Sequence, residues 1–420
     1  MSERDPEQTD RRAGRSGVSR RGLLVGAAAL GGAGVGGVAG AGLARASAAD
    51  VPAADAAGQR VVSPYGAHQA GIATPAQGFA TLVAFDLVAR TDRDALVRLM
   101  RIWSDDIGRL CAGRAGLSDT EPELAQVPAA LTITLGYGPG LFTAARLESE
   151  RPSWLAPLPP FGVDRLEDRW NGGDVLLQVC ADDPTTVAHA VRLLTKEART
   201  FTTVRWVQHG FRRAPGSTPP GTSMRNLMGQ VDGTHTIADD EMDGLVWVGD
   251  RSAEWFGAQP AWLEGGTSLV VRRIAMNLDT WDELDAPARE DVIGRRLADG
   301  APLTGGAEHD DVDLDAVGDN GLPVIGAYAH VRRARSDDPH QRFLRRPYSY
   351  DAAPTGGALS DSGLIFATYQ ADVTRQFTPI QQRLDELDLL NQWTTPVGSA
   401  VFAVPPGFEQ GGWLGEPLLG

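Results

Sequence analysis

The sequence predicts an α+β fold of two ferredoxin-like units, each with the order β-α-β-β-α-β, which together form a pseudo-twofold dimeric α+β barrel. Three observations predict it. Strand and helix patterns follow this order twice; a stretch rich in Pro and Gly at 213–222 separates the two runs; and 42% of the 420 residues are hydrophobic, which is enough for a large core. Paired sheets and helices of this kind can enclose a pocket.

The N-terminal unit is expected over residues 63–215. Its first helix is indicated by Thr91 and Asp94, a helix-start pattern that precedes apolar residues at helical spacing. Its second helix begins at Asp183-Pro184, because Asp caps a helix and Pro suits the first turn. The expected elements are, in order, a strand at 79–88, a helix from 91, strands at 130–135 and 174–180, a helix from 183, and a strand at 201–207.

The C-terminal unit is expected over residues 222–420, with no obvious sequence repeat of the first. An apolar run at 324–331 predicts a strand that leads into a histidine, and Phe377, Ile380, Leu384 and Leu387 mark one face of a long helix. The expected elements are a strand at 268–278, a helix at 287–297, strands at 324–331 and 364–369, a helix at 374–390, and a strand at 400–404.

Residues 1–48 have the pattern of a Tat signal peptide. Arg20-Arg21 follows Ser19, residues 25–44 are uncharged, and Ala46-Ser47-Ala48 is a small-x-small cleavage site. A membrane anchor is the alternative, although many glycines make the segment only mildly hydrophobic. We therefore expect secretion through the Tat translocon, and a flexible segment at 49–62.

The composition excludes some classes of protein. The formal charge is −15, and it becomes −18 once residues 1–48, with seven Arg and four acidic residues, are removed. Such an acidic chain argues against nucleic acid as a partner. Cys111 and Cys180 form no Cys-x-x-Cys pair, and no His-x-x-x-His pair exists, which disfavours zinc sites and c-type haem. Both cysteines are expected to be buried thiols, with a single disulfide as the alternative.

His330 is the strongest candidate for a metal ligand. It follows the apolar run and precedes Arg332, Arg333 and Arg335, so a flat apolar cofactor with acidic side groups would suit the segment. One axial histidine is what haem b requires. A half-buried histidine at a strand end is the alternative, whereas His309 and His340 lie in polar stretches typical of loops.

An acid and an arginine pair could supply the opposite face of such a site. Asp232 lies in Gly-Gln-Val-Asp-Gly-Thr (229–234), where an ordinary turn is the alternative. Arg345 and Arg346 follow an apolar pair, so strand alternation would direct one inward and one outward. Two surface arginines would be the other interpretation.

Six segments match one family in order and context. They are Tyr-Gly-Ala-His-Gln-Ala-Gly-Ile at 65–72, Gly-Gln-Val-Asp-Gly-Thr at 229–234, Ile-Gly-Arg at 293–295, Ala-His-Val-Arg at 329–332, Leu-Arg-Arg-Pro-Tyr-Ser-Tyr at 344–350 and Gly-Leu-Ile-Phe through Tyr-Gln-Ala-Asp at 363–372. The chain thereby resembles the dye-decolorizing peroxidase family, in its Tat-exported, haem deferrochelatase-like branch.

The resemblance implies one haem b per chain, held in a pocket of the barrel fold, and a role for each matched residue. His330 would be the proximal iron ligand, and Asp232 and Arg345 the catalytic pair on the opposite face. The remaining cofactor contacts would be Arg295 at a propionate, Gly233, Thr234 and His235 along the haem, Asp372 as partner of the proximal imidazole, and Arg335 at a second propionate. Pro347 departs from the glycine that often follows the arginine pair.

The resemblance also implies an activity: a secreted peroxidase that uses hydrogen peroxide to oxidise dyes, phenols or other one-electron donors. A haem- or iron-acquisition protein with incidental peroxidase activity is the alternative, because its motifs would be identical. A third hypothesis, a haem-free barrel that binds another ligand, is disfavoured by His330, Asp232 and Arg345 together. The oligomeric state and the natural reductant do not follow from the sequence.

Overall fold

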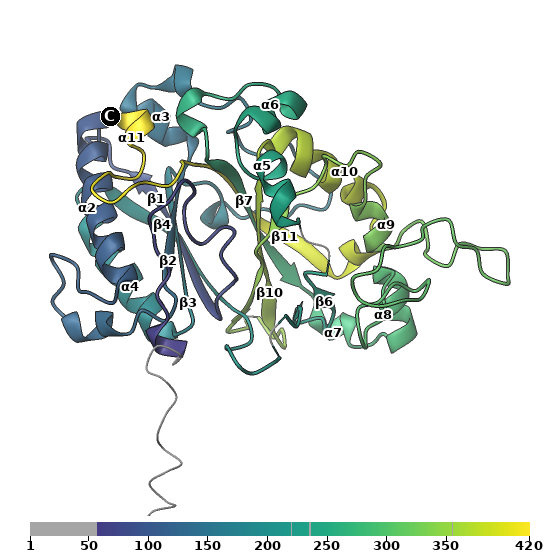
Figure 1. Ribbon diagram of the computed structural model, residues 1–420. Helices are drawn as coiled ribbons and strands as arrows, with labels where there is room; N and C mark the ends of the chain where they lie inside the picture. Colours follow the sequence, from purple (N-terminus) through teal and green to yellow (C-terminus); the bar gives the residue numbers. More distant parts are fainter. Residues whose placement is uncertain (1–56, 220, 235–236, 355) are drawn as a thin grey trace, which may run out of the picture. The chain divides into compact units, whose positions relative to one another are not determined.

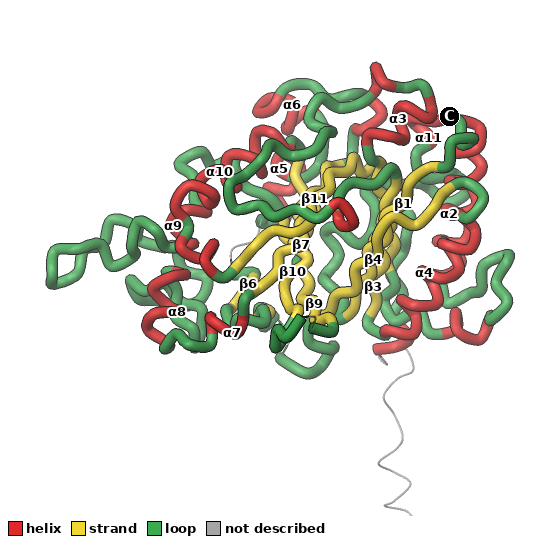
Figure 2. The backbone as a smooth tube through the Cα atoms, turned by 180° about the vertical axis from the view of Figure 1, so that it is seen from behind, coloured by secondary structure: helices red, strands yellow, loops and turns green. Residues whose placement is uncertain are grey.

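The computed structural model describes residues 57–219, 221–234, 237–354 and 356–420. Its centre is a closed barrel of eight antiparallel strands in the order β7-β11-β2-β3-β1-β4-β9-β10, closed by pairing of β10 with β7 (Figure 1). Helices lie around the barrel on both sides, as the view from behind shows (Figure 2). The predicted α+β barrel fold is confirmed.

The first half of the chain supplies four barrel strands and two long helices. Its elements are β1 (Phe79–Leu87), α2 (Arg93–Cys111), β2 (Thr132–Tyr137), α3 (Pro139–Ala145), β3 (Val175–Ala181), α4 (Pro184–Ala198) and β4 (Thr202–Phe211), with short 3-10 helices at Ala57–Gln59, Pro122–Gln126, Glu148–Glu150 and Asp168–Trp170. Asp92 caps α2 by accepting a bond of 2.9 Å from the Ala95 amide, so the cap lies one residue after the predicted Thr91.

The second half supplies the other four barrel strands and three further strands of two residues each, with more irregular connections. Its strands are β5 (Met224–Arg225), β6 (Val231–Asp232), β7 (Thr267–Met276), β8 (Leu344–Arg345), β9 (Tyr348–Ala352), β10 (Asp361–Gln370) and β11 (Thr394–Val404). Its helices are α5 (Met242–Leu245), α6 (Asp250–Phe256), α7 (Leu278–Trp281), α8 (Ala286–Ile293), α9 (His330–Ala334), α10 (Thr378–Leu387) and α11 (Glu416–Leu419). Short 3-10 helices lie at Asp239–Glu241, Ala261–Leu263 and Leu389–Gln392, and a π-helical turn at Val373–Phe377 precedes α10.

The two halves meet along two short seams of the barrel. β2 pairs with β11 through Tyr137 and Ala403, and β4 pairs with β9 through Phe211 and Ser349. Within each half the ladders are long; β10 and β7, for example, pair from Ser362–Met276 to Gln370–Ser268. Each half is therefore a four-stranded sheet, and the barrel forms where the edges of the two sheets join.

One predicted element is wrong. Residues 324–331 do not form a strand; this run turns at Gly326 and ends at α9, which begins at His330. Ile325 and Ala329 are buried in a small cluster with Val312 outside the barrel, which explains why the run is apolar. The second strand of this half is β9, in which Tyr348 and Tyr350 are both buried.

The N-terminal predictions lie mostly outside the described residues, since only residues 57–62 of the first 62 are described. Residues 57–62 contact the rest of the fold: the Ala129 amide donates to Gly58 O at 2.9 Å, and Arg60 pairs with Asp182 at 3.4 Å. Within the described chain, no helix has both the length and the apolar character needed to span a bilayer.

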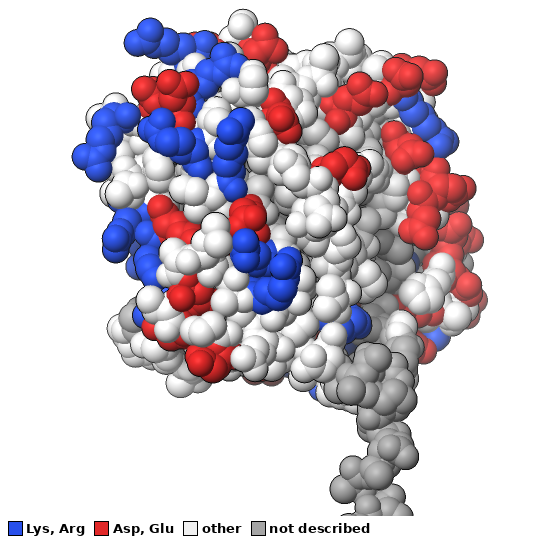
Figure 3. All heavy atoms as spheres, turned by 60° about the vertical axis from the view of Figure 1, so that its left-hand side comes forward, with Lys and Arg blue, Asp and Glu red and all other residues white. Residues whose placement is uncertain are grey.

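Both cysteines are buried free thiols, so the described chain contains no bridge between them. Burial raises the pKa of Cys111 to about 12, which keeps this thiol protonated and unreactive. The charged side chains are unevenly distributed on the surface. On one face, one side carries mainly Asp and Glu, whereas the other side carries most of the Lys and Arg with acidic residues among them (Figure 3).

Candidate active site

His330 is the first residue of α9 and is oriented by a carboxylate from another segment. Its Nδ1 lies 2.6 Å from Oδ2 of Asp388, whose side chain is almost fully buried. Asp388 follows α10 and caps the next 3-10 turn through the Leu390 amide. Because Nδ1 donates to this carboxylate, the other ring nitrogen, Nε2, carries the lone pair and is the available metal ligand.

The pKa of His330 depends on its burial and on three charged side chains near it. Burial opposes protonation, but the negative charge and hydrogen bond of Asp388 outweigh this and raise the pKa of His330. The charge of Arg345 acts to lower that pKa and the charge of Asp232 to raise it. The side chain remains 36% exposed, so the ring borders an open space rather than packed protein.

Asp232 and Arg345 form an ion pair. Arg345 Nη1 lies 3.0 Å from Asp232 Oδ1, and both side chains are largely buried. Asp232 ends β6 in a small hairpin with β5, while Arg345 on β8 pairs with Thr368 of β10. Two segments 113 residues apart thus bring an acid and a cation together, as the sequence-based assignment requires.

The second arginine of the pair points the other way. Arg346 is 3% exposed and donates to the carbonyl of Ile72 at 3.4 Å and to the side chain of Gln77. It therefore anchors the early segment of residues 65–77 to the barrel. Strand alternation separates the roles: Arg345 faces Asp232 and Arg346 supports the fold.

Arg295 lies directly after α8, close to the histidine helix. Gly294 ends α8 with φ of +88°, and a Cβ there would come within 2.5 Å of Val331 on α9. Arg295 is 8% exposed and donates to the carbonyls of Gly300 and Glu308, each at 2.8 Å. Burial, reinforced by the positive charge of Arg335, lowers the pKa of Arg295. An anion bound between these two arginines would reduce the repulsion between their charges.

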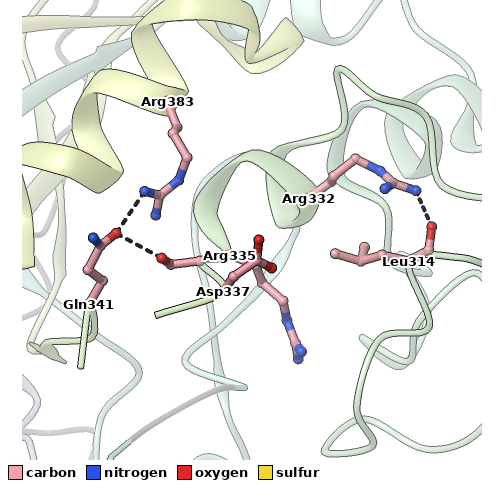
Figure 4. Close-up of a pocket in the computed structure, with 7 residues that line it drawn as sticks. Leu314, Arg332, Arg335, Asp337, Gln341 and Arg383 are labelled. Atoms are coloured by element: carbon pink, nitrogen blue, oxygen red, sulfur yellow. Dashed lines mark hydrogen bonds between the residues drawn. The ribbon is translucent and has the colours of Figure 1, made fainter. Parts of the chain in front are cut away.

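A pocket of about 350 Å³ lies beside α9 (Figure 4). Arg335 lines it and pairs with Asp311 at 3.2 Å. The guanidinium groups of Arg332 and Arg383 also line it but point away from one another, toward Leu314 O and Gln341 respectively (Figure 4). Arg335 therefore lines a solvent-accessible pocket beside α9, and its charge also acts on Arg295.

The glycine-flanked turn after β6 has an open geometry. Gly233 has φ of +120°, and no atom would lie within 4 Å of a Cβ placed there. Thr234 Oγ1 is buried without a hydrogen-bond partner in the described chain, while its carbonyl accepts from His309 Nδ1 at 3.0 Å. The next predicted residue, His235, lies outside the described residues.

The assignment of Asp372 is corrected. This residue was expected to be the partner of the proximal imidazole, but its Oδ1 accepts from the Arg375 amide at 2.8 Å and caps the π-helical turn. Asp388 is the actual partner. The sequence offered little to find it, because an Asp at the end of a helix usually serves as a cap for the following turn, which Asp388 also does.

Two family models together match almost all of the described chain. The model of the Dyp-type peroxidase N-terminal domain matches residues 69–212, and that of the C-terminal domain matches residues 223–409. The chain belongs to the Dyp-type peroxidase family. Its members are haem peroxidases, so the His330, Asp232 and Arg345 geometry lies in an enzyme of that class.

Characterised relatives carry two different names. The chain is 40% identical over 363 residues to a dye-decolorizing peroxidase of Thermobifida fusca, with 84% of each chain covered. It is 33% identical over 375 residues to a deferrochelatase of Yersinia pestis, again with 84% of each covered. The chain is thus similar over most of its length both to a protein named as a peroxidase and to one named as a deferrochelatase.

Solved structures show the same fold. The crystal structure of a DyP-type peroxidase from Cellulomonas bogoriensis is 60% identical with a TM-score of 0.84, covering 87% of this chain and 99% of that one. Ferric DtpA from Streptomyces lividans is 41% identical with a TM-score of 0.81, covering 86% and 98%. The eight-stranded barrel is therefore the fold of DyP-type peroxidases.

Proposed function

We propose that this chain is an exported peroxidase that binds one haem b and uses hydrogen peroxide to oxidise dyes, phenols or other small one-electron donors. One observation carries the proposal. A single, partly exposed histidine, oriented by Asp388, lies close enough to the ion pair of Asp232 and Arg345 for both charges to influence its pKa. These are the groups that peroxide chemistry on an iron porphyrin needs: one axial ligand, one acid–base group and one cation.

The residues present fit a haem. His330 offers Nε2 because Nδ1 is engaged by Asp388, and 36% of its side chain faces open space. Arg295 is a buried cation near two other arginines, which suits a propionate. Among the described residues, no three His, Cys, Asp or Glu side chains gather to hold a bare metal ion, so a single-histidine cofactor suits the site better.

When bound, haem supplies a redox-active iron at which peroxide is reduced to water while electrons are drawn from the donor. The protein supplies the proton transfers. The carboxylate of Asp232 accepts the proton of the peroxide oxygen nearer the cofactor and returns it to the outer oxygen, which leaves as water. The hydrogen bond of 3.0 Å from Arg345 fixes the position of the Asp232 carboxylate for this proton transfer.

Arg345 supplies charge and position. Its guanidinium stays positive and presents several N–H donors, so it stabilises the negative charge that develops as the oxygen–oxygen bond breaks. Pairing with Thr368 in the sheet fixes the backbone of Arg345, so its direction is set by β10 rather than by a loop. Asp388 acts on the other face, where it makes the His330 imidazole a stronger electron donor.

The extracytoplasmic location is part of the proposal. The twin arginine, the uncharged segment and the small-x-small site within residues 1–48 support export through the Tat translocon. This route carries folded proteins, so a cofactor could be inserted before export. The first test is N-terminal sequencing of the exported protein: cleavage after residue 48 supports the proposal, and retention of residues 1–48 contradicts it.

A second function is favoured by a specific observation. Relatives named deferrochelatase are 33–34% identical over most of the chain. In that function, iron leaves the haem and the porphyrin remains intact. Asp232 would then carry protons from solvent to the porphyrin nitrogens as iron departs, and Arg345 would hold its carboxylate in place.

One experiment tests both functions. The haem-loaded protein is mixed with hydrogen peroxide and a reducing dye, and dye oxidation and metal-free porphyrin are followed in the same samples. Peroxide-dependent dye oxidation that His330→Ala abolishes supports the peroxidase. Accumulation of metal-free porphyrin without dye turnover supports iron release, and neither product in the loaded wild type contradicts both.

A further inference from the structure

An open groove of about 770 Å³ runs along α4 on the outer face of the N-terminal half. Its walls are α4 on one side and the outward faces of β1 and β4 on the other. A volume of this size is typical of sites for small organic ligands. The groove lies in the first half of the chain and includes none of the residues assigned above to the peroxidase site.

The groove is lined mainly by apolar side chains that the fold leaves uncovered. Val204 is 46% exposed near the start of β4, and Val191 and Val207 are only half-buried. The β1–β4 ladder shifts register between Ala84 and Phe85, where Val204 re-enters the pairing. An irregularity of this kind turns the strand locally and alters the direction of its side chains. Exposed valines on a concave surface indicate a site for an apolar ligand.

The charged residues that line the groove are all basic and gather at one end of it. Among the described residues that line it, none is acidic, although the chain as a whole carries a charge of −15. Arg192 and Lys196 lie on the C-terminal half of α4, and Arg199 is the residue that caps its C-terminus. The N-terminal half of the same helix contributes Pro184, Val187 and Ala188 instead, so one end of the groove is apolar and the other cationic.

At the cationic end, two side chains have polar groups without a partner among the described residues. Thr195 Oγ1 is buried there and has no hydrogen-bond partner in the described chain. Arg192 pairs with Glu121 at 3.2 Å and Lys196 donates to Ser118 O at 2.8 Å, but Arg199 makes no hydrogen bond or ion pair with a described residue. A ligand carboxylate could accept from Thr195 and pair with Arg199.

We propose that this groove binds a long-chain fatty carboxylate, with its head group at Thr195 and Arg199 and its alkyl chain running along α4 toward Pro184. The shape favours a linear ligand over a compact ring system. From Pro184 to Arg199 the helix axis extends roughly 22 Å at 1.5 Å per residue, which suits an extended alkyl chain. This site is independent of the peroxidase function.

The test is isothermal titration of the haem-loaded protein with myristate below its micellar concentration. A cationic amphiphile with the same alkyl chain, myristyltrimethylammonium, serves as the ligand control. We expect one myristate per chain with micromolar affinity, and at least tenfold weaker binding of the cation. Equal binding of both amphiphiles, or no binding of myristate, would overturn the proposal.

Three variants localise the site. Val207→Asp places a carboxylate among the valines and should weaken myristate binding at least tenfold. Arg199→Glu reverses the exposed charge and should weaken it at least fivefold without affecting the fold. Arg98→Glu makes the same charge change on the exposed side of α2, outside the groove, and should leave binding unchanged. Equal effects of Arg98→Glu and Arg199→Glu would contradict a site at this end of α4.

A second copy of the chain is the competing occupant of an apolar groove. Light scattering of the ligand-free protein at several concentrations distinguishes the two. A monomer that binds myristate supports the proposal. A dimer that Val207→Asp dissociates, with no myristate binding in the wild type, would overturn it.

Discussion

His330 and Asp388 lie 2.6 Å apart, Nδ1 to Oδ2, although 58 residues separate them in the sequence. Asp388 is held at the end of α10 by its own capping bond, and the Leu389 amide donates to Tyr328 O at 3.0 Å, close to the start of α9. The carboxylate that orients the His330 imidazole is therefore fixed by backbone contacts on both sides.

Asp388→Asn should leave haem bound but raise its reduction potential, because the amide no longer makes the imidazole a strong donor. Turnover with peroxide should fall roughly tenfold to a hundredfold. Potentiometric titration and dye oxidation measure the two effects. Asp372→Asn is the matched control: asparagine can still accept from the Arg375 amide, so both thermal stability and the potential should stay close to those of the wild type.

Arg345→Leu should slow the reaction with peroxide by about a hundredfold or more, since a preorganised cation is lost where negative charge develops. Asp232→Asn should slow it similarly, and the double variant should be little slower than the worse single variant, because the two residues act as a pair. Stopped-flow mixing with peroxide measures each rate. Arg296→Leu, which breaks an exposed ion pair with Asp299, should have no effect; additive losses in the double variant would contradict a shared role.

Gly294→Ala should destabilise the protein and weaken haem binding, because its φ is +88° and the new Cβ would come within 2.5 Å of Val331 beside His330. The expected loss is about 2–3 kcal/mol, strain and overpacking combined. Gly321→Ala has a similar φ of +76° but open space around its Cβ, so it should cost only the strain of about 1–2 kcal/mol. Chemical denaturation compares them; equal losses would show that α8 does not support α9.

The stability of the N-terminal half should decrease as pH rises. Burial, followed by the neighbouring Asp106, raises the pKa of Glu197 from 4.5 to about 8. Between these values the folded chain keeps a proton that the unfolded chain releases, so the free energy of unfolding falls as pH increases from about 4.5 to 8. Glu197→Gln should flatten this dependence and raise the melting temperature at pH 8.

Glu121→Gln is the control for that pH profile. Hydrogen bonding from Thr120 and the charge of Arg192 lower the pKa of Glu121, so its contribution is present above the unfolded pKa and is lost as pH falls. Removing this carboxylate should therefore not flatten the alkaline part of the profile. A Glu197→Gln profile identical to the wild type would show that this carboxyl does not hold its proton in the folded state.

The sequence predicts elements well where periodicity and caps agree, as in α2 and α4, whose apolar stripes are buried and whose Asp92 and Asp183 cap the first turns. It failed at residues 324–331, because a short apolar run does not distinguish a strand from a buried irregular segment. The closure of two sheets into one barrel depends on only two residue pairs at the seams, and no local pattern indicates these pairs.

In the candidate site, too, some residues can be predicted from the sequence and others cannot. Asp232 and Arg345 could be paired from their motifs, and the structure brings them within 3.0 Å. Asp388 could not be found, because its role depends on how the end of α10 packs against the start of α9. Asp372 lies in a segment that matches the family pattern, yet its carboxylate accepts from the amide of Arg375 rather than contacting His330.

Haem titration of the wild type and His330→Gly, followed by visible absorption and electron paramagnetic resonance, tests whether His330 binds the iron. We predict a histidine-ligated ferric haem in the wild type, loss of that spectrum in the variant, and its return when free imidazole is added. A wild-type spectrum that persists unchanged in His330→Gly without imidazole would contradict the assignment of His330 as the axial ligand.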